Sequence, residues 1–279
     1  MSPLIQITDP HILDGSAILI DVRGGADAHA RYLAGHLPNA VFAGLDADLA
    51  SHPADAAIGG RHPLPALEGF AETLARWGVT PGSHVIVYDD KAAAMGGARL
   101  WWMLRSIGHT NVQVINGGLK AATDAGIQLA TDEYQNTAVA PYPVAAEYAN
   151  TVDIEEVKKA AKDENRVVID VREGVRYQGI TEPLDLVAGH IPGAVNLFYS
   201  TSMSPEGKYL TSQALTTLYK DTIGDVKPEN VVVHCGSGVT ACHTLLGMEH
   251  AGITGPKLYV GSWSEWSRND LPIGTGMDK

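Results

Sequence analysis

VVIDVREG (residues 167–174) repeats ILIDVRGG (residues 18–25), and this repeat decides how the whole chain folds. Three more pairs of segments follow in the same order: AGHLPNAV (34–41) and AGHIPGAV (188–195), HVIVYDDKAAAMGGARL (84–100) and NVVVHCGSGVTACHTLL (230–246), VINGGLKAA (114–122) and LYVGSWSEW (258–266). Chance similarity does not keep four blocks in register along a chain. The sequence therefore predicts one fold that is used twice.

Each half alternates short apolar runs with helical patterns. The runs AILIDV (17–22), HVIVYD (84–89) and VQVIN (112–116) are apolar at nearly every position, as strands buried on both faces are. Segments 69–79 and 98–108 carry apolar residues at helical spacing, and each helical pattern closes on a glycine, Gly78 in the first and Gly108 in the second. We expect an α/β protein of two tandem domains, each a mostly parallel sheet flanked by helices, over residues 1–135 and 151–279, with a polar, proline-containing linker at 136–150.

Composition and charge narrow the classes of function. The net charge of −12 argues against binding to nucleic acid or to an anionic membrane surface. The two cysteines cannot form a disulfide framework, which favours a reducing compartment, and the N-terminus shows no signal-peptide pattern. No apolar run approaches the roughly 18 residues that a membrane-spanning helix needs. We therefore expect a cytoplasmic protein.

The duplication separates residues that serve the fold from candidates for chemistry. Asp21 and Arg23 recur as Asp170 and Arg172, and the histidine of the GH-[LI]-P turn is present in both halves, as His36 and His190. We expect these duplicated residues to be structural, as a charge pair at a strand end and as part of a turn. Features present in one half only are the candidates for catalysis.

Cys235 is the clearest of these one-sided features, because the first half has Asp89 at the equivalent position. The segment GSGVTA (236–241) follows a predicted strand and precedes a predicted helix, so its backbone N–H groups can converge on an anion. A thiolate held in this way is a ready nucleophile. The alternative, a buried structural cysteine, fits poorly with an aspartate in the other copy. Cys242 is expected to pack in the following helix, and a redox partnership with Cys235 is the less favoured alternative.

His234 and Cys235 also match the opening of the phosphatase signature H-C-x5-R. The sixth residue after the cysteine is Ala241 instead of arginine, so the loop lacks the guanidinium that clamps a phosphoryl group. A cysteine phosphatase is therefore a distant alternative.

The segments DVR…GHIPGA, CGSGVTA and GSWSEW resemble the tandem rhodanese family of sulfurtransferases, and within it the loop resembles that of 3-mercaptopyruvate sulfurtransferases. The resemblance implies that Cys235 takes sulfur from 3-mercaptopyruvate or thiosulfate as a persulfide and passes it to cyanide or a thiol, a thioredoxin-like protein being one candidate acceptor. It implies no metal or other cofactor, an inert first domain, and a substrate-binding loop made of Gly236, Gly238, Val239 and Thr240. The rival interpretation is a persulfide carrier or binding module that serves a protein partner.

A mercaptopyruvate donor carries a carboxylate, so its site needs a positive charge. Arg176 matches the arginine with which the family binds this end of the donor, although a structural arginine is a serious alternative. The family pattern has a second arginine shortly after a T-E-P stretch. Here TEPLDLVA (181–188) contains none, so half of the expected carboxylate clamp is missing.

Loss of sulfur from mercaptopyruvate leaves an enolate that must be protonated. In the family, the serine of CGSG does this with the help of an Asp and a His from the first domain. Ser237, His62 and Asp46 match these positions, which implies a relay of acid–base groups beside the nucleophile. Taken alone, His62 would be a histidine in a surface loop.

Overall fold

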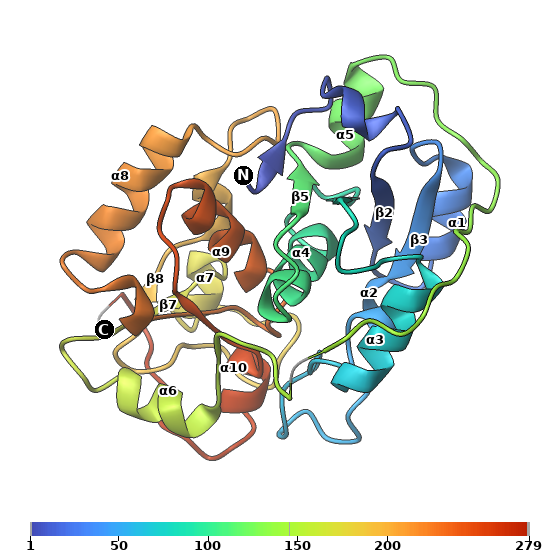
Figure 1. Cartoon of the computed structure of the whole chain (residues 1–279). Coiled ribbons are helices and arrows are strands. Elements are labelled where there is room, and N and C mark those ends of the chain that lie inside the picture. The colour runs from blue at the N-terminus through green and yellow to red at the C-terminus, as the bar shows by residue number, and fades with distance from the viewer. Residues whose placement is uncertain (1, 145, 278–279) are drawn as a thin grey trace. The chain divides into compact units, whose positions relative to one another are not determined.

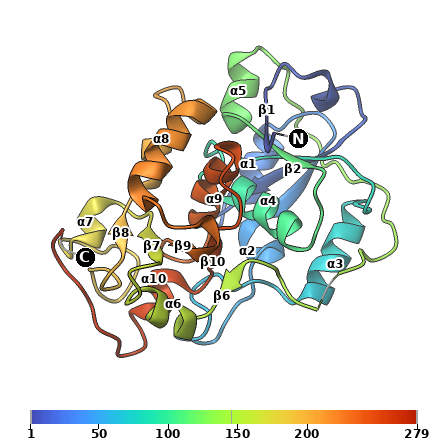
Figure 2. The same ribbon diagram turned by 60° about the vertical axis from the view of Figure 1, so that its left-hand side comes forward.

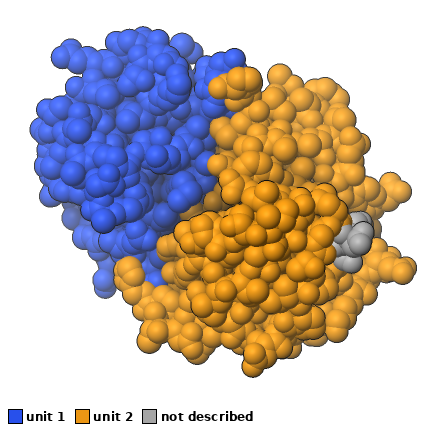
Figure 3. Space-filling model, turned by 180° about the vertical axis from the view of Figure 1, so that it is seen from behind, with its two compact units in different colours: residues 1–51, 64–149, 206–208 blue, residues 52–63, 150–205, 209–279 orange. Residues whose placement is uncertain are grey.

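The computed structural model describes residues 2–144 and 146–277, so Ala145 of the predicted linker and the outermost residues of the two predicted domains lie outside the described part. The chain divides into two compact units (Figure 3). The first comprises residues 1–51, 64–149 and 206–208, and the second comprises residues 52–63, 150–205 and 209–279. Residues 52–63 therefore belong to the second unit although they precede most of the first in sequence.

The first unit is built on a five-stranded sheet in the order β1-β5-β4-β2-β3, and all its pairings are parallel (Figure 1). Its strands are β1 (Leu4–Ile5), β2 (Ile18–Arg23), β3 (Ala40–Gly44), β4 (Val85–Tyr88) and β5 (Val112–Ile115). Its helices are η1 (Pro10–Ile12), α1 (Ala28–Ala34), α2 (Leu45–Asp48), α3 (Leu67–Arg76), α4 (Gly96–Ser106) and α5 (Gly118–Asp124).

The second unit repeats this topology in the order β6-β10-β9-β7-β8, again with parallel pairings (Figure 2). Its strands are β6 (Thr151–Val152), β7 (Val167–Asp170), β8 (Val195–Asn196), β9 (Val231–His234) and β10 (Lys257–Tyr259). Its helices are α6 (Ile154–Ala160), α7 (Gly174–Tyr177), η2 (Tyr199–Ser202), α8 (Ser212–Ile223), η3 (Pro228–Asn230), α9 (Ala241–His250) and α10 (Ser262–Trp266).

The central strands explain why each sheet is parallel and covered. Every residue of β4 and of β9 is buried, so each strand needs apolar neighbours on both faces of its sheet. Helices such as α4 and α9, which are themselves mostly buried, supply them. The predicted α/β fold with two parallel sheets is therefore confirmed, and the sheet edge at which the parallel strands end is where ligands bind in such folds.

The duplicated polar residues play the same structural part in both units. Arg23 donates two hydrogen bonds to Asp21, at 2.8 and 2.7 Å, and a third to the carbonyl of Gly35. Arg172 repeats this arrangement with Asp170 and the carbonyl of Gly189. All four charged side chains are buried.

The backbone N–H groups of the loop after β4 bind a carboxylate of the same chain, that of Asp89. The carboxylate of Asp89 accepts hydrogen bonds from the backbone N–H groups of Lys91, Ala93 and Gly97, at 2.9, 2.7 and 2.9 Å. Burial raises the pKa of Asp89, and these N–H groups oppose the rise by stabilising its charged form. The carboxylate also holds together a loop in which Ala92 and Ala93 have positive φ, of 55° and 63°. In the first unit, the side chain of Asp89 therefore occupies the space that the loop encloses.

Among the described helices, none is both long and apolar enough to span a bilayer.

Candidate active site

Cys235 follows β9 directly, at the edge where the strands of the second sheet end. Its side chain is 3% exposed, and its N–H donates to Oγ of Ser262 at 3.2 Å. Its carbonyl accepts from the N–H of Trp263, and the carbonyl of Gly236 accepts from the N–H of Ser264. The beginning of α10 therefore fixes the backbone on which the thiol sits, which explains why GSWSEW accompanies the cysteine loop in sequence.

A cavity of about 200 Å³ opens onto Cys235. It is suited to a small polar donor, because its lining combines the thiol with charged and aromatic side chains: Val171, Arg172, Glu173, Arg176, Phe198, Tyr199, Cys235, Gly236 and Thr240. Of the predicted substrate-binding residues, Arg176, Gly236 and Thr240 line this cavity. The cavity thus places a nucleophile and a positive charge in one small space.

Two of the predicted loop residues shape the loop without lining the cavity. Gly238 has φ of +74°, and a Cβ at this position would run into the carbonyl of Val260. Val239 is buried, and its carbonyl accepts from the N–H of Cys242 at the start of α9. Cys242 is itself buried, with its thiol 3.4 Å from the carbonyl oxygen of Gly238, and both cysteines are free thiols.

Buried carboxylates hold the arginines of the site in place. Glu182 accepts from Nε and Nη2 of Arg176, at 3.1 and 2.6 Å, and from Nη1 of Arg172 at 3.1 Å. The guanidinium of Arg172 also lies over the ring of Trp263, 4.5 Å from its centre. The counterpart of Arg172 in the first unit, Arg23, bonds only Asp21 and Gly35 among the described residues. The link through Glu182 is therefore specific to the unit that carries the cysteine.

The ion pairs near the cysteine loop determine the protonation states of the acidic side chains there. Burial alone would favour a neutral Asp170, but the charge and hydrogen bonds of Arg172 keep the pKa of Asp170 below its ordinary value. Burial also raises the pKa of Glu182, but the hydrogen bonds from Arg176 and from the N–H of Leu184, together with the charges of Arg176 and Arg172, outweigh burial and lower this pKa. Burial lowers the pKa of His234, so this histidine is neutral at physiological pH. The arginines are therefore met by ionised carboxylates.

Ser237 and His62 lie together in the second unit. Nδ1 of His62 is 2.7 Å from Oγ of Ser237, which is 7% exposed and two residues from the nucleophile. The structure thus brings two of the three predicted relay residues into hydrogen-bonding contact across 175 positions of sequence. Asp46 lies in α2 of the first unit, directly after β3, and its part in the relay stays a prediction.

Arg61, Glu182 and Asp185 contribute to the site but were not among the predicted residues. Arg61 donates from Nε to the buried carboxylate of Asp185 at 3.0 Å, and Arg268 donates to the same oxygen at 3.1 Å. Both acids lie in TEPLD (181–185), where the sequence pattern drew attention to a missing arginine instead of to the acids present. Arg61 could have been noticed only as the neighbour of His62.

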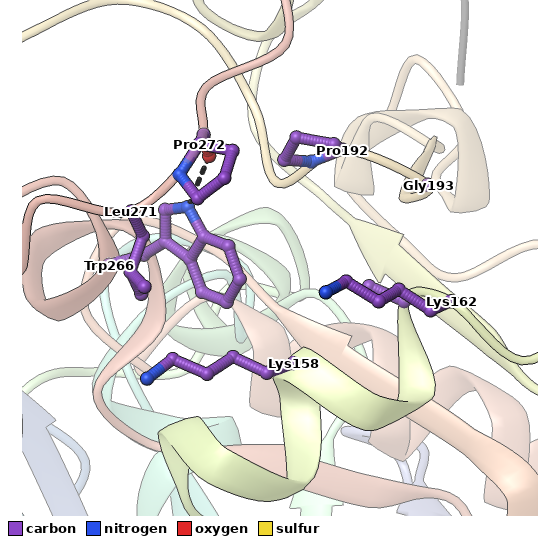
Figure 4. Close-up of a pocket in the computed structure, with 8 residues that line it drawn as sticks. Lys158, Lys162, Pro192, Gly193, Trp266, Leu271 and Pro272 are labelled. Carbon is purple, nitrogen blue, oxygen red and sulfur yellow. Dashed lines mark hydrogen bonds between the residues drawn. The ribbon is translucent and has the colours of Figure 1, made fainter.

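A larger cavity of about 340 Å³ lies elsewhere on the second unit (Figure 4). Lys158 and Lys162 extend toward it from α6 and the turn after it, and the indole of Trp266, whose Nε1 donates to the carbonyl of Pro272, forms a wall. It shares no lining residue with the cavity at Cys235 and contains no nucleophilic thiol or hydroxyl. Among the described residues, no group of three or more His, Cys, Asp or Glu side chains could hold a metal ion.

Comparison with known proteins agrees with this geometry. The pattern of the rhodanese-like domain matches residues 9–125 and, a second time, residues 153–269. The chain belongs to the rhodanese family. The two matches contain nearly all the strands of the two sheets, so the predicted tandem arrangement of this family is confirmed.

Curated relatives of this rhodanese include proteins named as sulfurtransferases. A probable 3-mercaptopyruvate sulfurtransferase of Pseudomonas aeruginosa is 34% identical over 267 residues, which cover 95% of this chain and 92% of the relative. A putative thiosulfate sulfurtransferase (SseB) of Mycobacterium tuberculosis is 36% identical over 284 residues, covering 99% of this chain and 95% of the relative. Among solved structures, 3-mercaptopyruvate sulfurtransferase from Leishmania major matches with a TM-score of 0.81 at 28% identity, over 98% of this chain and 76% of that one.

Proposed function

We propose that this rhodanese transfers a sulfur atom from 3-mercaptopyruvate or thiosulfate through a persulfide on Cys235 to a thiophilic acceptor such as cyanide or a thiol. One observation carries the proposal: the thiol of Cys235 and the guanidinium of Arg176 line the same small cavity. The nucleophile reacts with the sulfur of the donor, and the cation binds its carboxylate. The names of the full-length relatives support the same class of reaction.

The first half-reaction follows from the groups in the cavity. The thiolate of Cys235 attacks the donor sulfur, an S–S bond forms, and the bond between sulfur and C3 of mercaptopyruvate breaks. Its electron pair stays on the carbon as the enolate of pyruvate, and the transferred sulfur keeps its hydrogen as Cys–S–SH. The enolate takes a proton from the hydroxyl of Ser237, and His62, at 2.7 Å, returns a proton to that oxygen.

The second half-reaction restores the enzyme. Cyanide, or the thiolate of an acceptor, attacks the outer sulfur of the persulfide and leaves as thiocyanate or as a new persulfide. The electron pair of the broken S–S bond returns to Cys235 as its thiolate, and the proton that the outer sulfur carried passes to the solvent. Ser262 and the start of α10 hold the backbone of Cys235 through their hydrogen bonds, so the sulfur is presented from a fixed position.

A thiocyanate assay with either donor and cyanide tests the proposal. We expect turnover by the wild type and none by Cys235→Ser, because an alcohol at this position cannot form a persulfide. Cys242→Ser is the matched control, since it changes the other thiol of the chain and should keep most of the activity. Turnover by Cys235→Ser would contradict the proposal. Negligible turnover of both donors by a wild type that can be persulfidated on Cys235 would instead identify a carrier that serves a protein partner.

A further inference from the structure

Two guanidinium groups converge on the backbone next to the nucleophile. A Cβ atom added to Gly236 would lie 3.1 Å from Nη2 of Arg61 and 3.5 Å from Nη2 of Arg176. Glycine at this position therefore leaves space that two arginines border. Arg61 comes from the segment 52–63, which is far from the cysteine loop in sequence and clusters with it in the second unit.

Asp185 sets the position of both arginines. Its carboxylate is fully buried, accepts from Nε and Nη2 of Arg61 at 3.0 and 3.4 Å, and lies 3.6 Å from Nη2 of Arg176. A carboxylate without access to water must remain paired, so it holds the two guanidinium groups as a unit. The bonds that Arg61 and Arg176 make within the described residues use Nε and Nη2 of each, which leaves Nη1 of each for a ligand.

An ion-pair network surrounds the two arginines. Within the described chain, it joins four arginines, Arg61, Arg172, Arg176 and Arg268, to three carboxylates, Asp170, Glu182 and Asp185. The network atoms nearest Gly236 are Nη2 of Arg61 and Nη2 of Arg176, and no atom of Arg268 is among them. Arg61 and Arg176 are therefore the members of the network placed to contact an anion next to Cys235.

We propose that Arg61, together with Arg176, binds the carboxylate of the sulfur donor and so supplies the second positive charge that TEPLDLVA (181–188) lacks. The identity of the donor rests on the proposed function, whereas the cationic contact does not. Arg61 is adjacent to His62, so one short segment would bring both the contact for the carboxylate and the partner of Ser237 to the cysteine loop. The planar guanidinium group of an arginine can donate two parallel hydrogen bonds to one carboxylate.

Alkylation of Cys235 tests the cationic contact without any sulfur donor. Iodoacetate and iodoacetamide react alike, since the thiolate forms an S–C bond and iodide leaves, but only iodoacetate carries a carboxylate. We expect the wild type to react faster with iodoacetate relative to iodoacetamide than a free thiol does. Arg61→Gln should reduce this preference about tenfold, as loss of one charge-assisted hydrogen bond does, and leave the iodoacetamide rate nearly unchanged. Mass spectrometry of the peptide containing Cys235 gives both rates.

Donor kinetics supply the second readout. Arg61→Gln should raise KM for 3-mercaptopyruvate about ten- to a hundredfold with a much smaller change in kcat, because the contact is present before and after sulfur transfer. Arg61→Lys should recover part of the loss by restoring the charge. Arg268→Gln is the matched control: it removes another arginine from Asp185 but none of the atoms nearest Gly236, so KM should change little.

Three outcomes separate the possibilities. An unchanged KM and an unchanged iodoacetate preference in Arg61→Gln would overturn the assignment of Arg61. Equal losses in Arg61→Gln and Arg268→Gln would overturn it too, because they would reveal a structural role of the whole network. A wild type whose iodoacetate preference depends on Arg61 but which uses neither donor would retain the cationic contact and refute the proposed function alone.

Discussion

Ser237 bears on one chemical step, the protonation of the carbon that loses its sulfur. We predict that Ser237→Ala slows turnover of 3-mercaptopyruvate by about 10²- to 10⁴-fold, the usual contribution of a positioned acid. Turnover of thiosulfate should fall much less, because sulfite leaves with a stable negative charge and needs no proton at carbon. The measurement is kcat/KM for each donor with cyanide as acceptor. Equal losses on the two donors would contradict the relay.

The residues of the site differ in how far the sequence could indicate them. Cys235 stands out because its counterpart in the other repeat is Asp89, and Arg176, Ser237 and His62 were matched to family positions. Arg61 has no such signal: it lies in a loop without periodicity, and only the folded chain brings it within 3.1 Å of the position of a Cβ on Gly236. Long-range proximity of this kind is produced by tertiary packing, which no local pattern encodes.

The loop between β9 and α9 is the element on which the site depends. Gly238 combines a φ of +74° with a close approach to the carbonyl of Val260. We predict that Gly238→Ala lowers the free energy of unfolding by about 2–4 kcal/mol, from the left-handed backbone and from overpacking together. It should also reduce sulfur transfer, since the loop that carries Cys235 must shift. Chemical denaturation and the thiocyanate assay measure the two effects.

Gly252 provides the matched control for this change. Its φ is +81°, close to that of Gly238, but a Cβ there would meet nothing within 4 Å. Gly252→Ala should therefore cost only about 1–2 kcal/mol, the penalty of a left-handed backbone for a residue with a side chain, and leave activity intact. Equal destabilisation by the two substitutions would mean that the contact with Val260 is not important.

Elements with a strong pattern were predictable, and those without one were not. The apolar runs over 84–89 and 112–116 became β4 and β5, and the helical patterns ending at Gly78 and Gly108 became α3 and α4. The edge strands β1 and β6 have two residues each, too few to show any alternation, and they exist because β5 and β10 offer them parallel partners. Their stability comes from the sheet that they join.

At the scale of the molecule, acid should affect the two units differently. The folded state lowers the pKa of Asp170 and Glu182 in the second unit, so their contribution to stability is present above their ordinary values of 3.8 and 4.5 and is lost as pH falls through the lower folded values. Burial instead raises the pKa of Asp48 and Asp89 in the first unit, which favours that unit as pH falls. We predict that the second unit loses stability first as pH falls below about 4.5.

Hydrogen exchange resolved by peptide, and corrected for the intrinsic exchange rate at each pH, measures this difference. Protection of β7 and β9 should be constant from neutral pH down to about pH 4.5 and should then fall more than protection of β2 and β4. Glu182→Gln should lower protection of the second unit at neutral pH and flatten its dependence on pH, because the amide does not titrate. A uniform loss in both units would refute the prediction.

The carboxylate of Asp89 has a consequence for the stoichiometry of the protein. As a side chain of the protein, this carboxylate permanently occupies the position at which the second unit has its reactive sulfur. It accepts hydrogen bonds from the backbone N–H groups of Lys91, Ala93 and Gly97. A molecule with two equivalent loops therefore has the capacity for one sulfur atom per chain. Each turnover must empty that single position before the next donor can react, so donor and acceptor alternate at one atom.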